Sequence, residues 1–111
     1  ANNGGFIQAR TVIPRGAANG AQGVRLLVSG NGESYVVNLR TTGTRLPWHF
    51  YQASFEAGPD WTEVLLPFEG FRPSSDVLRR RVQPDRITTL SVAAYGKNYD
   101  ADIRVVEVGF Y

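Results

Sequence analysis

His49 is the only histidine in this 111-residue chain, and the chain contains no cysteine. Any nucleophilic mechanism that needs an imidazole base would therefore have to use His49. His49 alternates with Trp48 and Phe50 beside apolar residues, and no serine stands in the Gly-x-Ser-x-Gly pattern of a nucleophile elbow. We interpret His49 as a partly buried structural residue, with catalysis as the alternative, and predict that the chain is not an enzyme.

Carboxylates offer two further kinds of chemistry. Four of them could form the acid pair of a glycosidase, although they fall at expected strand ends and turns, where solvated acids are common: Glu56, Asp60, Glu63 and Glu69. Asp100 and Asp102, near Asn98, could place three oxygen ligands around Ca²⁺. The same cluster is typical of a turn in which the side chains bond local amides, and we favour the turn. No cofactor is predicted.

Planar polar side chains recur at outward positions of the expected strands. If the strand registers align, one sheet face collects seven residues: Arg10, Arg25, Asn38, Arg40, Trp48, Gln52 and Ser54. Planar donors beside an aromatic ring can form a binding surface for a ligand or a protein partner. The alternative is an exposed sheet face that carries ordinary polar residues.

The charge balance limits the classes of partner. Twelve Lys and Arg against ten Asp and Glu leave a formal charge of +2, with Lys97 as the only lysine. This charge is too small to predict nucleic-acid binding. Arg79-Arg80-Arg81 is either a solvated surface or a contact for an acidic partner. No apolar run is long enough to span a bilayer, and the lack of cysteine excludes disulfides and thiolate metal sites.

Short alternating runs separated by Gly, Pro or Asn clusters predict an all-β domain, because helical periodicity is hard to find. We expect one antiparallel β-sandwich, a jelly roll, over residues 1–111. Its seven strands are predicted at 5–13, 23–29, 34–41, 48–56, 62–66, 86–95 and 102–111. Gly30-Asn31-Gly32 accepts the positive φ of a tight turn, which predicts a hairpin between the second and third strands. Residues 72–85 are expected to form a long loop.

The period of two assigns side chains to faces of the strands. In the third strand, Val36, Asn38 and Arg40 point away from the core. The residues predicted to lie in the core are Tyr35, Val37, Leu39, Tyr51, Phe55, Val64, Leu66, Leu90, Val92, Val106 and Val108. Phe68 and Phe71 follow Pro67 and are expected to fold back onto this core.

Six motifs in order along the chain carry a family resemblance. They are Asn2-Asn3-Gly4-Gly5-Phe6 with Arg10; Gly30-Asn31-Gly32 with Tyr35, Leu39 and Arg40; Tyr51-Gln52-Ala53-Ser54-Phe55; Trp61, Val64 and Leu66-Pro67-Phe68; Phe71-Arg72-Pro73; and Pro84-Asp85-Arg86-Ile87. The chain resembles the complex I intermediate-associated protein 30 family, whose fold is a galactose-binding-domain-like β-sandwich. The resemblance extends over nearly the whole chain.

The resemblance implies a noncatalytic protein-interaction or assembly-factor module. Eukaryotic members assist assembly of respiratory complex I, and this chain is similar to bacterial members, which favours the bacterial cytoplasm. Because similar jelly rolls bind carbohydrate, a carbohydrate-binding module that uses the exposed aromatic and arginine face is the alternative. A hydrolase is a distant third.

The family usually carries a strand-bearing segment upstream of Asn2-Asn3-Gly4-Gly5. We therefore expect that an N-terminal strand is missing. The chain should then either pair with another copy or chain through the edge that is left, or be less stable than a chain extended upstream. Two loops also depart from the family: Ser74-Ser75-Asp76-Val77-Leu78 replaces an Arg-Gly signature, and Asp100-Ala101-Asp102-Ile103 replaces Gly-Pro-Phe. We therefore do not expect these two loops to carry the partner specificity that they have in the family.

Overall fold

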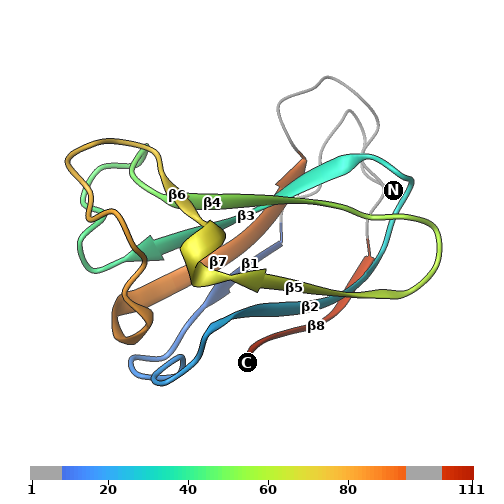
Figure 1. Cartoon of the computed structure of the whole chain (residues 1–111), viewed down its shortest axis with the longest axis horizontal. Helices are drawn as coiled ribbons and strands as arrows, with labels where there is room; N and C mark the ends of the chain where they lie inside the picture. Colours follow the sequence, from blue (N-terminus) through green and yellow to red (C-terminus); the bar gives the residue numbers. More distant parts are fainter. Residues whose placement is uncertain (1–8, 95–103) are drawn as a thin grey trace.

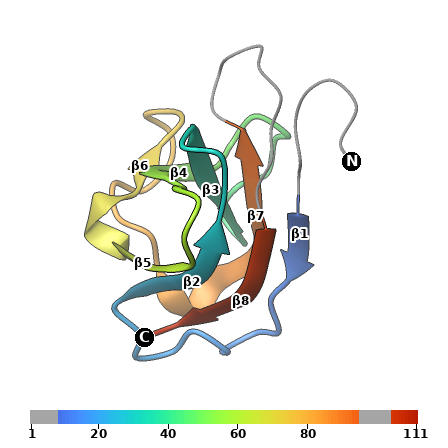
Figure 2. The same cartoon turned by 90° about the vertical axis from the view of Figure 1, so that its right-hand side faces the viewer.

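The computed structural model describes residues 9–94 and 104–111, which form two packed antiparallel sheets (Figures 1 and 2). The five-stranded sheet has the order β1 (Ala9–Val12), β7 (Ile87–Ala94), β3 (Ser34–Thr41), β4 (Tyr51–Glu56) and β6 (Arg72–Pro73). The three-stranded sheet has the order β5 (Thr62–Pro67), β2 (Gly23–Ser29) and β8 (Arg104–Phe110). Two short 3₁₀ turns, η1 (Phe68–Gly70) and η2 (Pro84–Arg86), complete the described elements. The predicted all-β sandwich is confirmed.

The Gly30-Asn31-Gly32 segment is a corner between the two sheets, so the predicted hairpin is wrong. β2 pairs with β5 and β8, whereas β3 pairs with β4 and β7. The backbone N–H groups of Gly30 and Gly32 donate to the carbonyl oxygens of Gly58 and Ala57, each at 2.7 Å. Gly32 does adopt the expected positive φ, 85°. The expected positive φ is therefore present. The backbone hydrogen bonds of the segment, however, go to residues that follow β4, and β2 does not pair with β3.

β2–β3 and β4–β5 behave as one bent antiparallel ribbon. Val28 lies opposite Thr62 in one sheet and Ser34 lies opposite Glu56 in the other, with the same number of residues between them on both sides. The register therefore continues through the corner. This bend places the inner faces of the two sheets against each other, where their apolar side chains meet.

One apolar cluster fills the space between the sheets. Tyr35, Val37 and Leu39 of β3 are fully buried against Val24, Leu26 and Val28 of β2. Tyr51, Phe55, Leu90 and Val92 also lie in the core, as predicted. Val64 and Leu66, predicted in the core, are partly buried and pack against it. Burial of each large apolar side chain contributes about 1.5–3 kcal/mol to folding.

Val108 is 41% exposed, so its prediction as a core residue is wrong. It lies on β8, which is an edge strand of the smaller sheet in the described part of the chain. The side chain of Val106 lies outside the described set. Self-association through an exposed edge stays a prediction.

Phe68 and Phe71 close the core from the side, which confirms the expectation for both. They are 1% and 2% exposed, and the Phe68 ring lies 6.3 Å from the ring of Phe110 on β8. Beyond β6, the chain to residue 85 is anchored by Val82, which is 1% exposed. The long loop is therefore held by an apolar contact while its arginines stay outside.

β4 begins at Tyr51 and not at the predicted residue 48. Residues 42–50 instead form a loop, in which the N–H of His49 donates to the carbonyl of Leu46 at 2.9 Å. This local bond replaces ladder bonds to β3. It leaves Trp48 exposed beside the outer face of the five-stranded sheet.

Candidate functional site

A row of polar side chains crosses the outer face of the five-stranded sheet. The strand registers place Arg10 opposite Ser91, Ser91 opposite Asn38, Asn38 opposite Gln52, and Gln52 opposite Arg72. Because side chains alternate along a strand, the row lies on the face away from Tyr35, Val37 and Leu39. Each strand of the sheet contributes one residue to this row, which we call the polar row.

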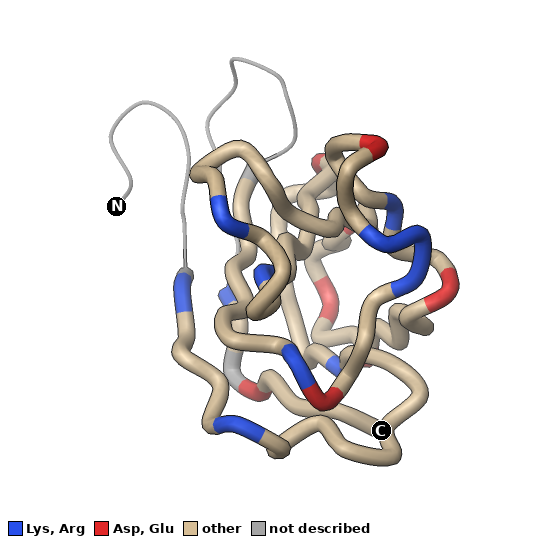
Figure 3. Tube along the Cα trace, turned by 90° about the vertical axis from the view of Figure 1, so that its left-hand side faces the viewer, with Lys and Arg blue, Asp and Glu red and all other residues tan. Residues whose placement is uncertain are grey.

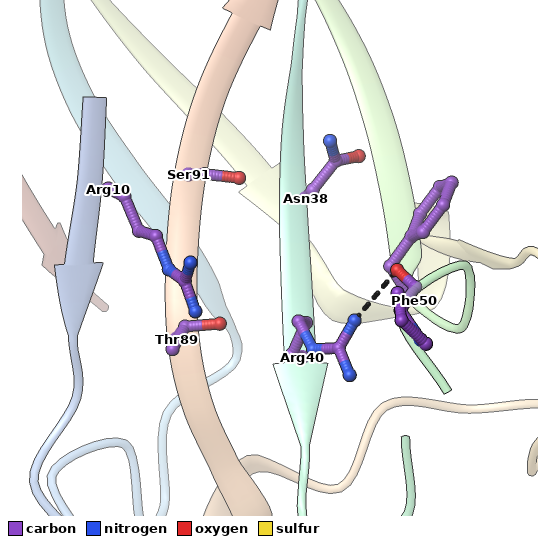
Figure 4. Close-up of a pocket in the computed structure, with 7 residues that line it drawn as sticks. Arg10, Asn38, Arg40, Phe50, Thr89 and Ser91 are labelled. Carbon is purple, nitrogen blue, oxygen red and sulfur yellow. Dashed lines mark hydrogen bonds between the residues drawn. The ribbon is translucent and has the colours of Figure 1, made fainter. Parts of the chain in front are cut away.

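A groove of about 500 Å³ lies over one half of the polar row. Arg10, Ser91 and Asn38 form its floor together with Thr89 and Arg40 from the adjacent row (Figure 4). Pro47 and Phe50 from the 42–50 loop form its wall. The groove therefore depends on β1, β7 and β3 for its donors and on a loop for its shape.

Arg40 holds that loop in place. Its Nη1 donates to the carbonyl oxygen of Pro47 at 2.9 Å, and its Nη2 donates to the carbonyl oxygens of Thr44 at 3.0 Å and Leu46 at 3.1 Å. The planar fork of a guanidinium suits several acceptors at once. Arg40 thus acts mainly by positioning the groove wall, although its charge stays beside the groove.

A second groove, of about 430 Å³, lies on the other side of Phe50. Gln52, Ser54 and Arg72 line it together with Ser74. The Ser74 hydroxyl accepts from the N–H of Phe50 at 3.0 Å and donates to the carbonyl of Trp48 at 2.7 Å. This bridge fixes the loop end that separates the two grooves.

Five of the seven predicted surface residues share this face: Arg10, Asn38, Arg40, Gln52 and Ser54. Trp48, the sixth, is 62% exposed on the adjoining loop and lines neither groove. Its ring lies edge-on to the ring of His49. Trp48 therefore stands at the border of the face.

Arg25 does not belong to this surface, and its inclusion in the predicted set is wrong. It lies on β2 in the other sheet, where its Nε is 2.6 Å from Glu63 and its Nη1 is 2.7 Å from Glu107. Its hydrogen bonds to Glu107 and, second, to Glu63 raise the pKa of Arg25 above its ordinary value. The three side chains form a surface ladder across β5, β2 and β8.

The sequence interpretation missed Thr89, Ser91, Phe50 and Arg72. Alternation with the inward Leu90 and Val92 could have placed Thr89 and Ser91 on the outer face. Arg72 carried no comparable signal, because β6 has only two residues. Phe50 was assigned to a strand and is instead a loop residue between two grooves.

The described residues offer little for proton transfer or metal binding. His49 is 8% exposed, and no hydrogen bond of its ring to any other described residue is present. No group of three His, Cys, Asp or Glu converges within residues 9–94 and 104–111. Asp100 and Asp102 lie outside the described residues, so their Ca²⁺ and turn interpretations both stay open.

The Arg79-Arg80-Arg81 run is exposed and forms a continuous basic stretch along the trace (Figure 3). The carbonyl of Arg79 accepts a 2.8 Å hydrogen bond from the Tyr51 hydroxyl. Burial raises the pKa of Tyr51 above its ordinary value of 10.0, against a smaller opposite effect of the Arg79 charge. A tyrosine of the core thereby ties the arginine run to the sandwich.

The family model for complex I intermediate-associated protein 30 matches residues 1–104. The chain therefore belongs to the complex I intermediate-associated protein 30 family, which confirms the resemblance seen in the sequence. None of the curated proteins compared matches it. No helix in the described part of the chain is long and apolar enough to cross a membrane.

Solved structures show the same fold in carbohydrate-binding modules. A family 11 module from Clostridium thermocellum, in complex with a β-1,3-1,4-mixed-linked tetrasaccharide, has a TM-score of 0.64 over 95% of this chain and 65% of its own. The family 11 module of the cellulosomal cellulase Lic26A-Cel5E from the same organism has a TM-score of 0.65, over 94% and 64%. Both are 13% identical to this chain. The chain thus spans slightly less than two thirds of either module and shares their galactose-binding-like sandwich.

Proposed function

We propose that this chain is a noncatalytic protein-interaction module of the assembly-factor type, which binds its partner through the outer face of the five-stranded sheet. The polar row carries this proposal, because it aligns side-chain donors across all five strands. Membership of the complex I intermediate-associated protein 30 family supports a partner that takes part in assembly of a respiratory complex.

The side chains of this face favour a protein over a neutral sugar. Arg10, Arg40 and Arg72 stand around the two grooves, and arginine is enriched where proteins bind proteins. Sugar rings are usually held on exposed, coplanar aromatic rings. Here Phe50 is only half-exposed between the grooves, and Trp48 is at the border.

Carbohydrate binding is the second candidate. One observation favours it: a similar module was solved with a tetrasaccharide, and this chain shares the fold. Two adjoining grooves of about 500 and 430 Å³ and the amides of Asn38 and Gln52 would suit a chain of hydroxyl-rich rings. Both candidates use the same face, so one experiment can separate them.

A photo-crosslinking residue placed at Ser54 tests the proposal. Ser54 is exposed on the outer face of the five-stranded sheet, and Leu65, 48% exposed on β5, is the matched control position on the other sheet. In extract of the native host, the Ser54 probe is expected to capture proteins that the Leu65 probe does not. The same two proteins are tested on a glycan panel that includes mixed-linked glucan oligosaccharides.

Identical capture from both positions would contradict a specific protein-binding face. Glycan binding that the Ser54 substitution abolishes, without such capture, would support the carbohydrate-binding candidate instead. Turnover of a glycan would contradict both noncatalytic candidates.

A further inference from the structure

The larger groove presents several hydrogen-bond donors from β1, β7 and β3. Oδ1 of Asn38 accepts from Nε2 of Gln52 at 2.9 Å, which leaves the Asn38 amide group as a donor. The hydroxyls of Thr89 and Ser91 and the guanidinium of Arg10 face the same space (Figure 4). A ligand rich in acceptor oxygens would satisfy this set.

The described lining of the larger groove is positively charged. Among the described residues, no carboxylate side chain lines either groove. Within the described residues, the ion pairs are those of Arg25 on the other sheet, and Arg10 and Arg72 have no hydrogen-bond partner for their guanidinium groups. The guanidinium of Arg40 already donates to loop carbonyls. It therefore contributes positive electrostatic potential to the groove and positions its wall, more than it offers hydrogen bonds to a ligand. An anionic ligand is therefore favoured.

The spacing of the two unpaired arginines limits the shape of that ligand. Arg10 and Arg72 stand at opposite ends of the polar row, four strand spacings apart, which corresponds to about 19 Å. An extended peptide covers this distance in about six residues. Asn38 and Gln52 lie between the two ends, where their amides can meet a peptide backbone.

On this basis we infer that the polar row binds an extended acidic segment of a protein partner that lies across the strands. Arg10 takes one carboxylate, and Arg72 takes a second carboxylate about six residues away along the segment. This inference rests on the proposed function and names the chemistry of the partner.

Synthetic peptides test the inference directly. The probe is a labelled Gly/Ser peptide with two glutamates six residues apart, compared with the same peptide carrying glutamines and with one carrying adjacent glutamates. Fluorescence anisotropy should show binding of the spaced peptide, with affinity lowered about tenfold for either comparison peptide. Affinity should fall as salt concentration rises.

Variants of the chain assign the contacts. Arg10→Gln and Arg72→Gln should each weaken binding of the spaced peptide about tenfold, since each removes one charged anchor. Arg104→Gln, the same change on exposed β8 of the other sheet, should leave affinity within about twofold. Arg10→Lys keeps the charge without the fork and should lose part of the affinity. Thermal melts show that each variant is folded.

Three results would overturn the inference. The first is equal affinity for the spaced and the adjacent peptide. The second is a loss of affinity in Arg104→Gln as large as that in Arg10→Gln or Arg72→Gln. The third is binding of polygalacturonate that depends on Arg10 and Arg72, while the spaced peptide does not bind. If protein capture from Ser54 persists in the Arg10→Gln, Arg72→Gln double variant, the proposed function stands and the acidic-segment inference fails.

Discussion

The side chain of Arg40 on β3 is bonded to Pro47 of the following loop, with Nη1 2.9 Å from the carbonyl oxygen. Its other terminal nitrogen is shared between the carbonyls of Thr44 and Leu46. One strand residue thereby shapes a nearby loop that carries Trp48 and forms the wall of the larger groove. Arg40, which the sequence predicts to contact a ligand, also positions the loop beside the groove.

Arg40→Ala should loosen the 42–50 loop, because three carbonyl acceptors lose their charged donor. We expect a loss of about 1–2 kcal/mol in the free energy of unfolding, measured by urea denaturation. Trp48 fluorescence, read in a Trp61→Phe background, should shift at the same time. Arg40→Lys serves as the control for charge and should recover only part of the loss. Unchanged stability and unchanged Trp48 emission in Arg40→Ala would contradict the positioning role.

Gly30→Ala should destabilise the corner between the sheets. A Cβ at Gly30 would lie 2.6 Å from the Cβ and 2.7 Å from the carbonyl oxygen of Ala57, which is too close for either atom. We expect a cost of about 1–3 kcal/mol, measured by thermal or urea unfolding. Gly58→Ala is the matched control in the segment between β4 and β5, since a Cβ there meets nothing within 4 Å. Equal effects of the two substitutions would show that close approach does not constrain the corner.

Tyr51 should make stability fall at alkaline pH. Burial raises its pKa above 10.0, so the neutral hydroxyl is favoured in the folded state. The contribution of the neutral Tyr51 hydroxyl to the free energy of unfolding is fully present below pH 10.0 and is lost as the pH rises through the raised pKa of the folded state. Tyr51→Phe should flatten this decline and cost about 1 kcal/mol near neutral pH through the lost bond to Arg79. Tyrosinate absorbance measures the pKa, and unfolding curves at several pH values measure the stability. An equal alkaline loss of stability in Tyr51→Phe would show that other groups cause it.

His49→Ala should reduce stability without revealing any catalytic role. Its side chain is 8% exposed and contacts Trp48, so truncation removes buried packing worth about 1–3 kcal/mol. Thermal melts measure the loss, and a hydrolase screen of the unmodified chain should find no turnover. Activity that this substitution abolishes in a still folded protein would show that the noncatalytic proposal is wrong.

Local patterns in the sequence determined the strands and their two faces. In β3, Tyr35, Val37 and Leu39 turn inward while Asn38 and Arg40 turn outward, because successive side chains of any strand point to opposite sides. The order of motifs determined the family and with it the sandwich, which the family match and the shared fold confirm.

Tertiary structure alone decided which sheet each strand joins. The same turn residues at Gly30-Asn31-Gly32 fit a hairpin or a corner, and only bonds to Ala57 and Gly58, far along the chain, select the corner. That choice places Arg25 on the opposite side of the sandwich from Arg10 and Asn38. The pairing of β6 with β4 brings Arg72 to the end of the polar row. Alternation is a property of neighbouring residues, whereas sheet membership comes from distant backbone pairing and shared burial, which no local pattern records.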